Sequence, residues 1–96
     1  MNVGIILMIN SFLKYLQFEK RYSQHTVISY RTDLVQFENF LQNSYPDIPI
    51  TLVDHRMIRD WIIQLVNTGK TERSVNRKIA SLRSFYKFLL KTIMDI

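Results

Sequence analysis

The residues best able to do chemistry in this chain are the lysines and arginines of one segment, residues 70–91. This segment holds seven Lys or Arg residues against one acid, Glu72, so its formal net charge is +6, whereas the whole chain carries +5. Residues 1–48 are neutral, because their four basic and four acidic residues balance. A basic charge that is concentrated on one rigid surface attracts polyanions. The sequence therefore predicts that this segment binds nucleic acid.

Helical spacing separates the basic residues of this segment from its apolar residues. At about 100° per residue, apolar side chains fall along one line: Val75, Ile79, Leu82, Tyr86, Leu89 and Ile93. The opposite face is free of acids, and it is predicted to carry Arg73, Arg77, Ala80, Ser81, Ser84, Lys87 and Lys91. Because the middle of this face is made of Ala and Ser, a phosphate backbone or groove wall could approach it closely.

Two kinds of contact are expected from this segment. Arg77 and Asn76 suit base edges or phosphates, because Arg can bind guanine and Asn can bind adenine through two hydrogen bonds. Lys70, Thr71 and the free backbone N–H groups at the helix start form an end that anchors a phosphate, helped by the helix dipole.

Patterns that would indicate catalysis or metal binding are scarce. His25 and His55 each lie beside a predicted helix start, and no carboxylate pattern around them resembles a metal site. Asp33 and Glu38 are five residues apart on one helix and do not share a face, so they make a poor acid–base pair. The chain has no cysteine, which excludes disulfides and a cysteine nucleophile and suits a reducing compartment such as the cytoplasm. We expect no catalytic residue, no metal site and no cofactor.

The elements that position these residues are predicted to be helices. With 47% hydrophobic residues and only two Gly and two Pro, the chain is expected to form one compact all-α domain. Four helices are predicted: about residues 11–21, 23–43, a third from Asp54 to a stop at residues 67–69, and a fourth capped by Thr71. Residues 10–93 then hold the four-helix core. Residues 1–9 are a tail or an early turn that packs on the core, and they are too short to span a membrane.

Two rival functions remain open at this point. A helical protein–protein interaction module would use outward apolar side chains such as Ile28 and Val35 to dock a partner. Phe88 either belongs to that patch or meets the first helix, while Phe85 is expected in the core. A peripheral membrane module led by residues 1–9 is the least favoured.

The residue pattern resembles a known family. Residues 23–37, SQHTVISYRTDLVQF, resemble the S-x-x-T-x-x-x-Y-x-x-D-x-x-x-F pattern of the N-terminal core-binding domain of tyrosine recombinases, the phage-integrase and Xer group. Residues 73–89 look like the matching later helix of that domain, and residues 54–61 fit the intervening D-x-x-x-I-x-x-[WFY] pattern. The resemblance covers roughly residues 10–92.

The resemblance implies a four-helix, SAM-like domain that grips one face of the recombination core site on double-stranded DNA. In the family, the second and fourth helices face the DNA, which adds Ser23, Thr26 and Arg31 to the candidate contacts. The domain forms a clamp with the protein's own C-terminal catalytic domain, and protomers can contact one another on the DNA. The family's catalytic Arg, Lys, His-x-x-Arg and nucleophilic Tyr belong to that second domain. Tyr30 and Tyr86 lie on apolar seams and are not expected to be the nucleophile.

Overall fold

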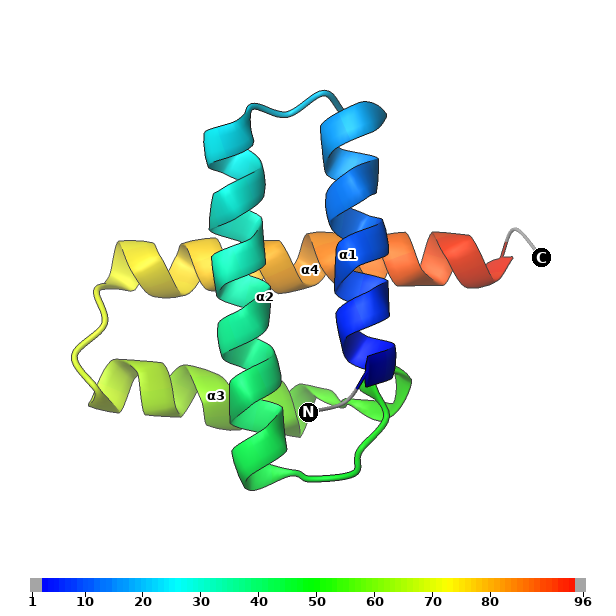
Figure 1. Ribbon diagram of the computed structural model, residues 1–96. Coiled ribbons are helices and arrows are strands. Elements are labelled where there is room, and N and C mark those ends of the chain that lie inside the picture. The colour runs from blue at the N-terminus through cyan, green and yellow to red at the C-terminus, as the bar shows by residue number, and fades with distance from the viewer. Residues whose placement is uncertain (1–2, 95–96) are drawn as a thin grey trace.

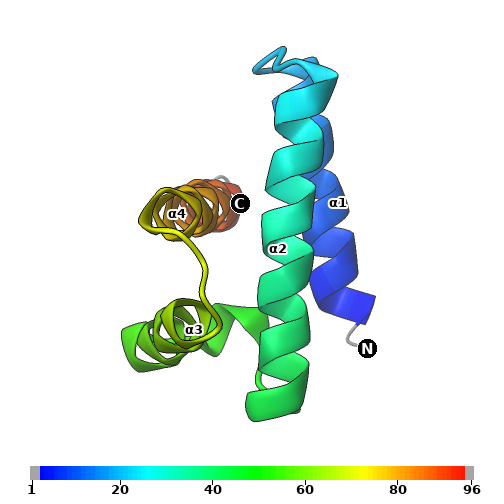
Figure 2. The same ribbon diagram turned by 90° about the vertical axis from the view of Figure 1, so that its left-hand side faces the viewer.

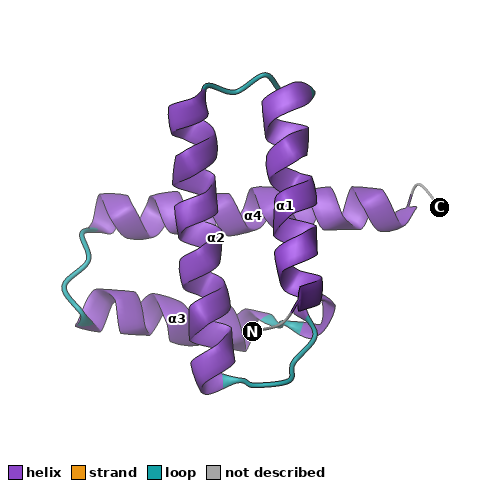
Figure 3. Ribbon diagram, viewed as in Figure 1, coloured by secondary structure: helices purple, strands orange, loops and turns teal. Residues whose placement is uncertain are grey.

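The computed structural model describes residues 3–94 and is all-α over that range, with four helices and one short 3-10 turn (Figure 1). The elements are α1 (Val3–Phe18), α2 (Gln24–Ser44), η1 (Ile50–Leu52), α3 (His55–Asn67) and α4 (Glu72–Met94). Loops join them, and no strand occurs among the described residues (Figure 3). None of the helices in this range is both long enough and apolar enough to cross a membrane.

Two helix pairs are packed across each other. α1 and α2 run side by side in opposite directions, and α4 crosses both on one side of the pair (Figures 1 and 2). α3 lies next to α4 on that same side. The end of the pair where α1 joins α2 extends past α4. In Figure 2 the upper parts of α1 and α2 therefore lie above α4.

The helix starts follow from the capping residues that the sequence contains. Ser23 Oγ accepts a 3.2 Å hydrogen bond from the backbone N–H of Thr26, and Asp54 Oδ1 accepts from the backbone N–H groups of Arg56 and Met57. Thr71 Oγ1 accepts from the Ser74 N–H at 3.1 Å. Each cap satisfies N–H groups that have no partner within the helix. The predicted starts of the second, third and fourth helices are thereby confirmed.

Gly69 ends α3 as predicted. Its φ is +84°, in the left-handed region that glycine adopts without steric cost. This turn lets the Gly69 and Lys70 N–H groups donate to carbonyls of the last turn of α3.

The first helix differs from its predicted bounds. It begins at Val3 instead of residue 11, and Ile5 and Ile9 are buried at 4% and 5% exposure. The apolar stripe of α1 therefore continues through the residues expected to form either a tail or an early turn that packs on the core, and this packing stabilises the extra turns. Ser11, where the first helix was predicted to begin, is an exposed residue within the helix. Met1 and Asn2 lie outside the described residues.

The other end of α1 also differs. The helix stops at Phe18, three residues before its predicted end, and Arg21 takes a left-handed φ of +56°. The Tyr22 N–H then donates to the Leu16 carbonyl at 3.0 Å, which closes the helix end. Sequence spacing gave no sign of this turn, because a left-handed conformation is unusual for arginine.

The core lies between the α1–α2 pair on one side and α3 and α4 on the other. Its buried apolar side chains are Ile5, Ile9, Phe12, Leu16, Leu34, Phe37, Phe40, Leu41, Ile50, Trp61, Leu65, Val75, Leu82, Phe85 and Leu89. Phe12 of α1 contacts Phe85 of α4 edge to face, with ring centroids 5.5 Å apart. Trp61 brings α3 onto Phe37 of α2 at 5.1 Å. The expectation that Phe85 belongs to the core is confirmed.

Phe88 meets the first helix, which was one of its two predicted positions. Its ring centroid lies 5.4 Å from that of Phe12 and 5.1 Å from that of Tyr15. Ile28 and Val35 point outward as predicted, at 51% and 38% exposure. The rival docking patch therefore loses Phe88, because that ring is packed against α1.

Candidate nucleic-acid interface

Two hollows lie along α4, where the projecting parts of α1 and α2 meet it. The first, which we call the Arg77 hollow, lies between α2 and α4 and is lined by Thr26, Ser29, Tyr30, Asp33, Arg77, Ala80 and Ser81. The second, the Tyr15 hollow, is lined by Phe12, Tyr15, Leu16, Lys20, Tyr22, Tyr30, Ser84, Lys87, Phe88 and Lys91. Tyr30 borders both hollows, so they form neighbouring parts of one concave surface.

A buried carboxylate organises the first hollow. Asp33 of α2 is 1% exposed, and each of its oxygens accepts a hydrogen bond from Arg77, Nη2 to Oδ1 at 2.7 Å and Nε to Oδ2 at 3.2 Å. Lys78 Nζ donates to Oδ1 at 3.0 Å, and Ser81 Oγ donates to Oδ2 at 2.7 Å. Lys78 also donates to Gln36. All three partners of Asp33 come from α4, so this cluster fixes the rotation of α4 against α2.

The cluster changes the acidity of its members. Burial by itself raises the pKa of Asp33, but the hydrogen bonds from Arg77, Ser81 and Lys78 outweigh it and hold that pKa below its ordinary value. The hydrogen bond to Asp33 in turn raises the pKa of Arg77. Both groups are therefore charged at neutral pH.

The prediction that Ser81 faces outward is wrong. Ser81 is 3% exposed, and its hydroxyl is engaged by Asp33. Lys78, one of the segment's seven bases, is also buried, at 2% exposure. The physical reason is that α4 packs on α1 and α2 along one side and on α3 along another, so its buried arc is wider than a single apolar seam.

Arg77 remains available at the surface although it is paired with Asp33. Its side chain is 51% exposed. A guanidinium carries five N–H donors, and only the Nε and Nη2 atoms are used within the described residues. The bidentate pairing fixes the plane of the group, while the free donors point away from the carboxylate. Asp33 therefore orients a cation that can still bind an anion.

The structure brings several other predicted contacts to the same surface. Thr26 lines the Arg77 hollow, and its hydroxyl lies 3.0 Å from that of Ser23. Ser84 and Lys87 line the Tyr15 hollow further along α4. The remaining candidates of α4 and its start are exposed: Lys70, Thr71, Arg73 and Asn76.

Arg31 does not join this surface. It lines a separate groove between α1 and α2, together with Asn10, Gln17 and Ile28. Five residues along a helix correspond to a rotation of about 140°, so Arg31 cannot share the face of Thr26. Thr26 and Arg31 therefore lie on different faces of α2.

Sequence reasoning missed two residues of this surface. Asp33 falls between Tyr30 and Phe37 on the apolar stripe of α2, at spacings of three and four, and an acid in that place signals a buried partner. Lys20 was overlooked because it reaches the Tyr15 hollow through the turn after α1, which the sequence does not reveal.

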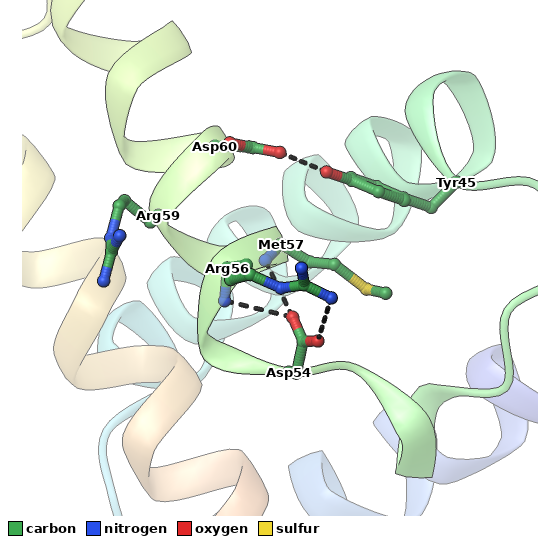
Figure 4. A pocket seen from close by; sticks show the side chains of 6 residues that line it. All are labelled: Tyr45, Asp54, Arg56, Met57, Arg59 and Asp60. Atoms are coloured by element: carbon green, nitrogen blue, oxygen red, sulfur yellow. Dashed lines mark hydrogen bonds and ion pairs between the residues drawn. The ribbon is translucent and has the colours of Figure 1, made fainter.

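A third hollow, at the start of α3, has mixed charge (Figure 4). Tyr45 donates a hydrogen bond to the Asp60 carboxylate, which raises the pKa of Tyr45. Asp54 pairs with Arg56 at 3.4 Å in the same hollow. Because acids stand beside the arginines here, this region suits a polyanion less well than the surface along α4.

Comparison with known proteins agrees with the residue pattern. Residues 9–92 match the family model described as phage integrase, N-terminal SAM-like domain. The tyrosine recombinase XerC of Anoxybacillus flavithermus is 38% identical over 90 residues, which cover 94% of this chain and 29% of that protein. XerC of Rickettsia conorii is 36% identical over 97 residues, covering 96% of this chain and 32% of that protein.

XerC of Bacillus licheniformis is 37% identical over 89 residues, covering 83% of this chain and 26% of that protein. This chain thus spans about a third or less of the length of these relatives. No solved structure gives a significant match. The match over residues 9–92 shows that the chain belongs to the phage-integrase N-terminal SAM-like domain family, the N-terminal domain of tyrosine recombinases.

Proposed function

We propose that this chain binds duplex DNA as the core-binding domain of a site-specific tyrosine recombinase. It holds the recombination core site with α4 and with the N-terminal end of α2. Strand exchange itself is then the work of a C-terminal catalytic domain in a longer protein, acting in the cytoplasm. The relatives named tyrosine recombinase XerC, each about three times as long as this chain or more, support this division of labour.

One observation carries the proposal: α4 presents an exposed run of cations with no acid between them. Arg73, Arg77, Lys87 and Lys91 follow one side of the helix, and only the small residues Ala80 and Ser84 separate the two pairs. From Arg73 to Lys91 the run is about 27 Å long at 1.5 Å per residue. This exceeds the roughly 12 Å width of the DNA major groove, so one helix can reach phosphates on both sides of a groove.

The parts of this surface have different expected roles. Lysines act as point charges on phosphates and position the domain without reading sequence. Arg77 has a fixed guanidinium plane, so it is the side chain best prepared to read a guanine edge or to bind a phosphate through two hydrogen bonds. Asn76, exposed beside it, is the second candidate for base reading. Ser23 and Thr26 offer hydroxyls to a phosphate at the start of α2.

Salt dependence of duplex binding tests the proposal. Each phosphate contact contributes about 0.9 to the slope of log affinity against log salt. Arg73→Gln removes one exposed cation that has no ion-pair partner among the described residues, so we expect the slope to fall by about 0.9 and the affinity to drop. Arg59→Gln is the matched control, because Arg59 is an exposed arginine of α3 in the hollow of mixed charge.

Two results would contradict the proposal. One is a duplex affinity of the unmodified chain that stays constant between 50 and 200 mM salt. The other is an equal loss of affinity in Arg73→Gln and Arg59→Gln, since the binding face would then not be that of α4.

A further inference from the structure

We propose that the Tyr15 hollow is a second phosphate site, which extends the DNA-binding surface from α4 onto the end of α1. The ligand is a phosphodiester of the DNA backbone, and its main new contact is Lys20. This inference rests on the proposed function for the identity of the ligand. The residues that carry it belong to α1, to the turn that follows α1 and to the C-terminal half of α4, and neither Arg77 nor Asp33 is among them.

Three lysines line this hollow, and two of them lie over one aromatic ring. Lys20 Nζ, in the turn that follows α1, lies 5.9 Å from the centroid of the Tyr15 ring, and Lys91 Nζ of α4 lies 6.0 Å from the same centroid. Lys87 borders the hollow as well. None of the three forms an ion pair within residues 3–94, and none of the residues that line the hollow is acidic. Three like charges are thus gathered without a counter-charge, and an anion between them would relieve their repulsion.

The floor of the hollow is rigid and apolar. The Tyr15 ring packs on Phe88 with centroids 5.1 Å apart and on Phe12 at 6.4 Å. On another side, Tyr22 stacks on Tyr30 at 6.1 Å. Aromatic walls exclude water from one side of the ammonium groups, which strengthens their attraction for an anion. The hydroxyl of Ser84, which also lines the hollow, can donate to a phosphate oxygen.

Helix dipoles explain only part of this arrangement. Lys20 follows the C-terminal end of α1 and Lys91 lies in the last turn of α4, and a helix C-terminus favours a cation in both places. The dipoles do not require that both ammonium groups lie over the same ring, nor that Lys87 joins them from the middle of α4. The convergence of two helices on one ring is what indicates a shared ligand.

The site also fits the length of the surface. Arg77 and Lys91 are separated by about 21 Å along α4 at 1.5 Å per residue. The hollow is about 380 Å³ in volume, and its Lys91 lies well beyond the reach of a phosphate that is held by Arg77. A DNA backbone that follows α4 would enter the Arg77 hollow with one phosphate and the Tyr15 hollow with another.

The test compares Lys20, in the turn after α1, with Lys14 within α1. Lys20→Gln removes the contact made by the turn after α1. Lys14→Gln is the matched control, since Lys14 is an exposed residue of α1 that lines none of the hollows described above. We measure duplex affinity from 50 to 200 mM salt. Unmodified chain should lose about 3.5-fold more affinity over this range than Lys20→Gln, which is a slope difference of about 0.9. Lys14→Gln should keep the slope of the unmodified chain.

The outcomes separate this inference from the proposed function. If Arg73→Gln lowers the slope but Lys20→Gln behaves like Lys14→Gln, the phosphate site is refuted and DNA binding by α4 stands. If the unmodified chain does not bind duplex DNA, the proposed function fails, and titration with inorganic phosphate decides the site. Amide shift changes at residues 20–22 and 84–91 that vanish in Lys20→Gln would support it, and their absence would overturn it.

Discussion

Asp33 and Arg77 are joined by two hydrogen bonds across 44 positions of the sequence, with the Nη2–Oδ1 distance at 2.7 Å and the Nε–Oδ2 distance at 3.2 Å. One end of this pair is buried and the other is half exposed. The pair therefore links the packing of α2 on α4 to the orientation of a cation on the proposed DNA-binding surface. Stability and binding can be separated by substitutions on either side of it.

Asp33→Asn should destabilise the fold. The substitution removes the negative charge that compensates Lys78, which is 2% exposed, and a buried charge that loses its partner typically costs about 3–5 kcal/mol. Urea unfolding followed by circular dichroism measures the change. Asp47→Asn is the control, because Asp47 is exposed and asparagine tolerates its φ of +69°. Equal stability of the two variants would show that the Asp33 cluster does not hold α4 in place.

The stability of the chain should fall in acid because of Asp33. The pKa of folded Asp33 lies below its ordinary value of 3.8, so the folded state binds this proton less readily than the unfolded state does. The contribution of ionised Asp33 to the free energy of unfolding is complete above a pH of about 4, and it is lost as the pH falls through the pKa of folded Asp33. We expect unfolding free energies measured from pH 7 down to pH 2 to decline less in Asp33→Asn than in the unmodified chain. A parallel decline in the two proteins would contradict this assignment.

DNA affinity should reveal that Asp33 acts through Arg77. Arg77→Lys keeps the positive charge but loses the bidentate pair of hydrogen bonds to Asp33. We therefore expect weaker duplex binding with little change in the salt slope. Asp33→Asn should weaken binding in the presence of Arg77, because the guanidinium is no longer held in one plane. On the Arg77→Lys background it should have a much smaller effect on affinity. Additive losses in the double variant would show that Asp33 affects binding only through the general stability of the fold.

The N-terminal turns of α1 should contribute to stability. Ile9 is 5% exposed, and truncation of a buried isoleucine to alanine costs about 2–5 kcal/mol. Leu7, on the same helix, is 60% exposed, so Leu7→Ala should change the unfolding free energy by only about 0.5 kcal/mol. Thermal or urea unfolding of the two variants checks the difference. If Ile9→Ala were as harmless as Leu7→Ala, residues 3–9 would behave as a tail, which was one of the two forms expected from the sequence.

Local signals in the sequence predicted most of the secondary structure. Ser23, Asp54 and Thr71 are side chains that cap a helix start by bonding to N–H groups two or three residues away, and Gly69 is the residue that tolerates a left-handed turn. These effects act within one helical turn, so they can be read without knowledge of the fold. The same is true of the charge of residues 70–91 and of the family pattern in residues 23–37.

The sequence by itself therefore determined the helices α2 to α4, the basic character of α4 and the family. The tertiary structure decided which side of α4 is exposed to solvent. Asp33 draws Lys78 and Ser81 inward, and α1 covers Phe88. It also decided where α1 begins, and that Lys20 reaches the Tyr15 hollow. The physical reason is that helical periodicity reports an average apolar direction, whereas the buried arc is set by all the neighbours that pack against the helix.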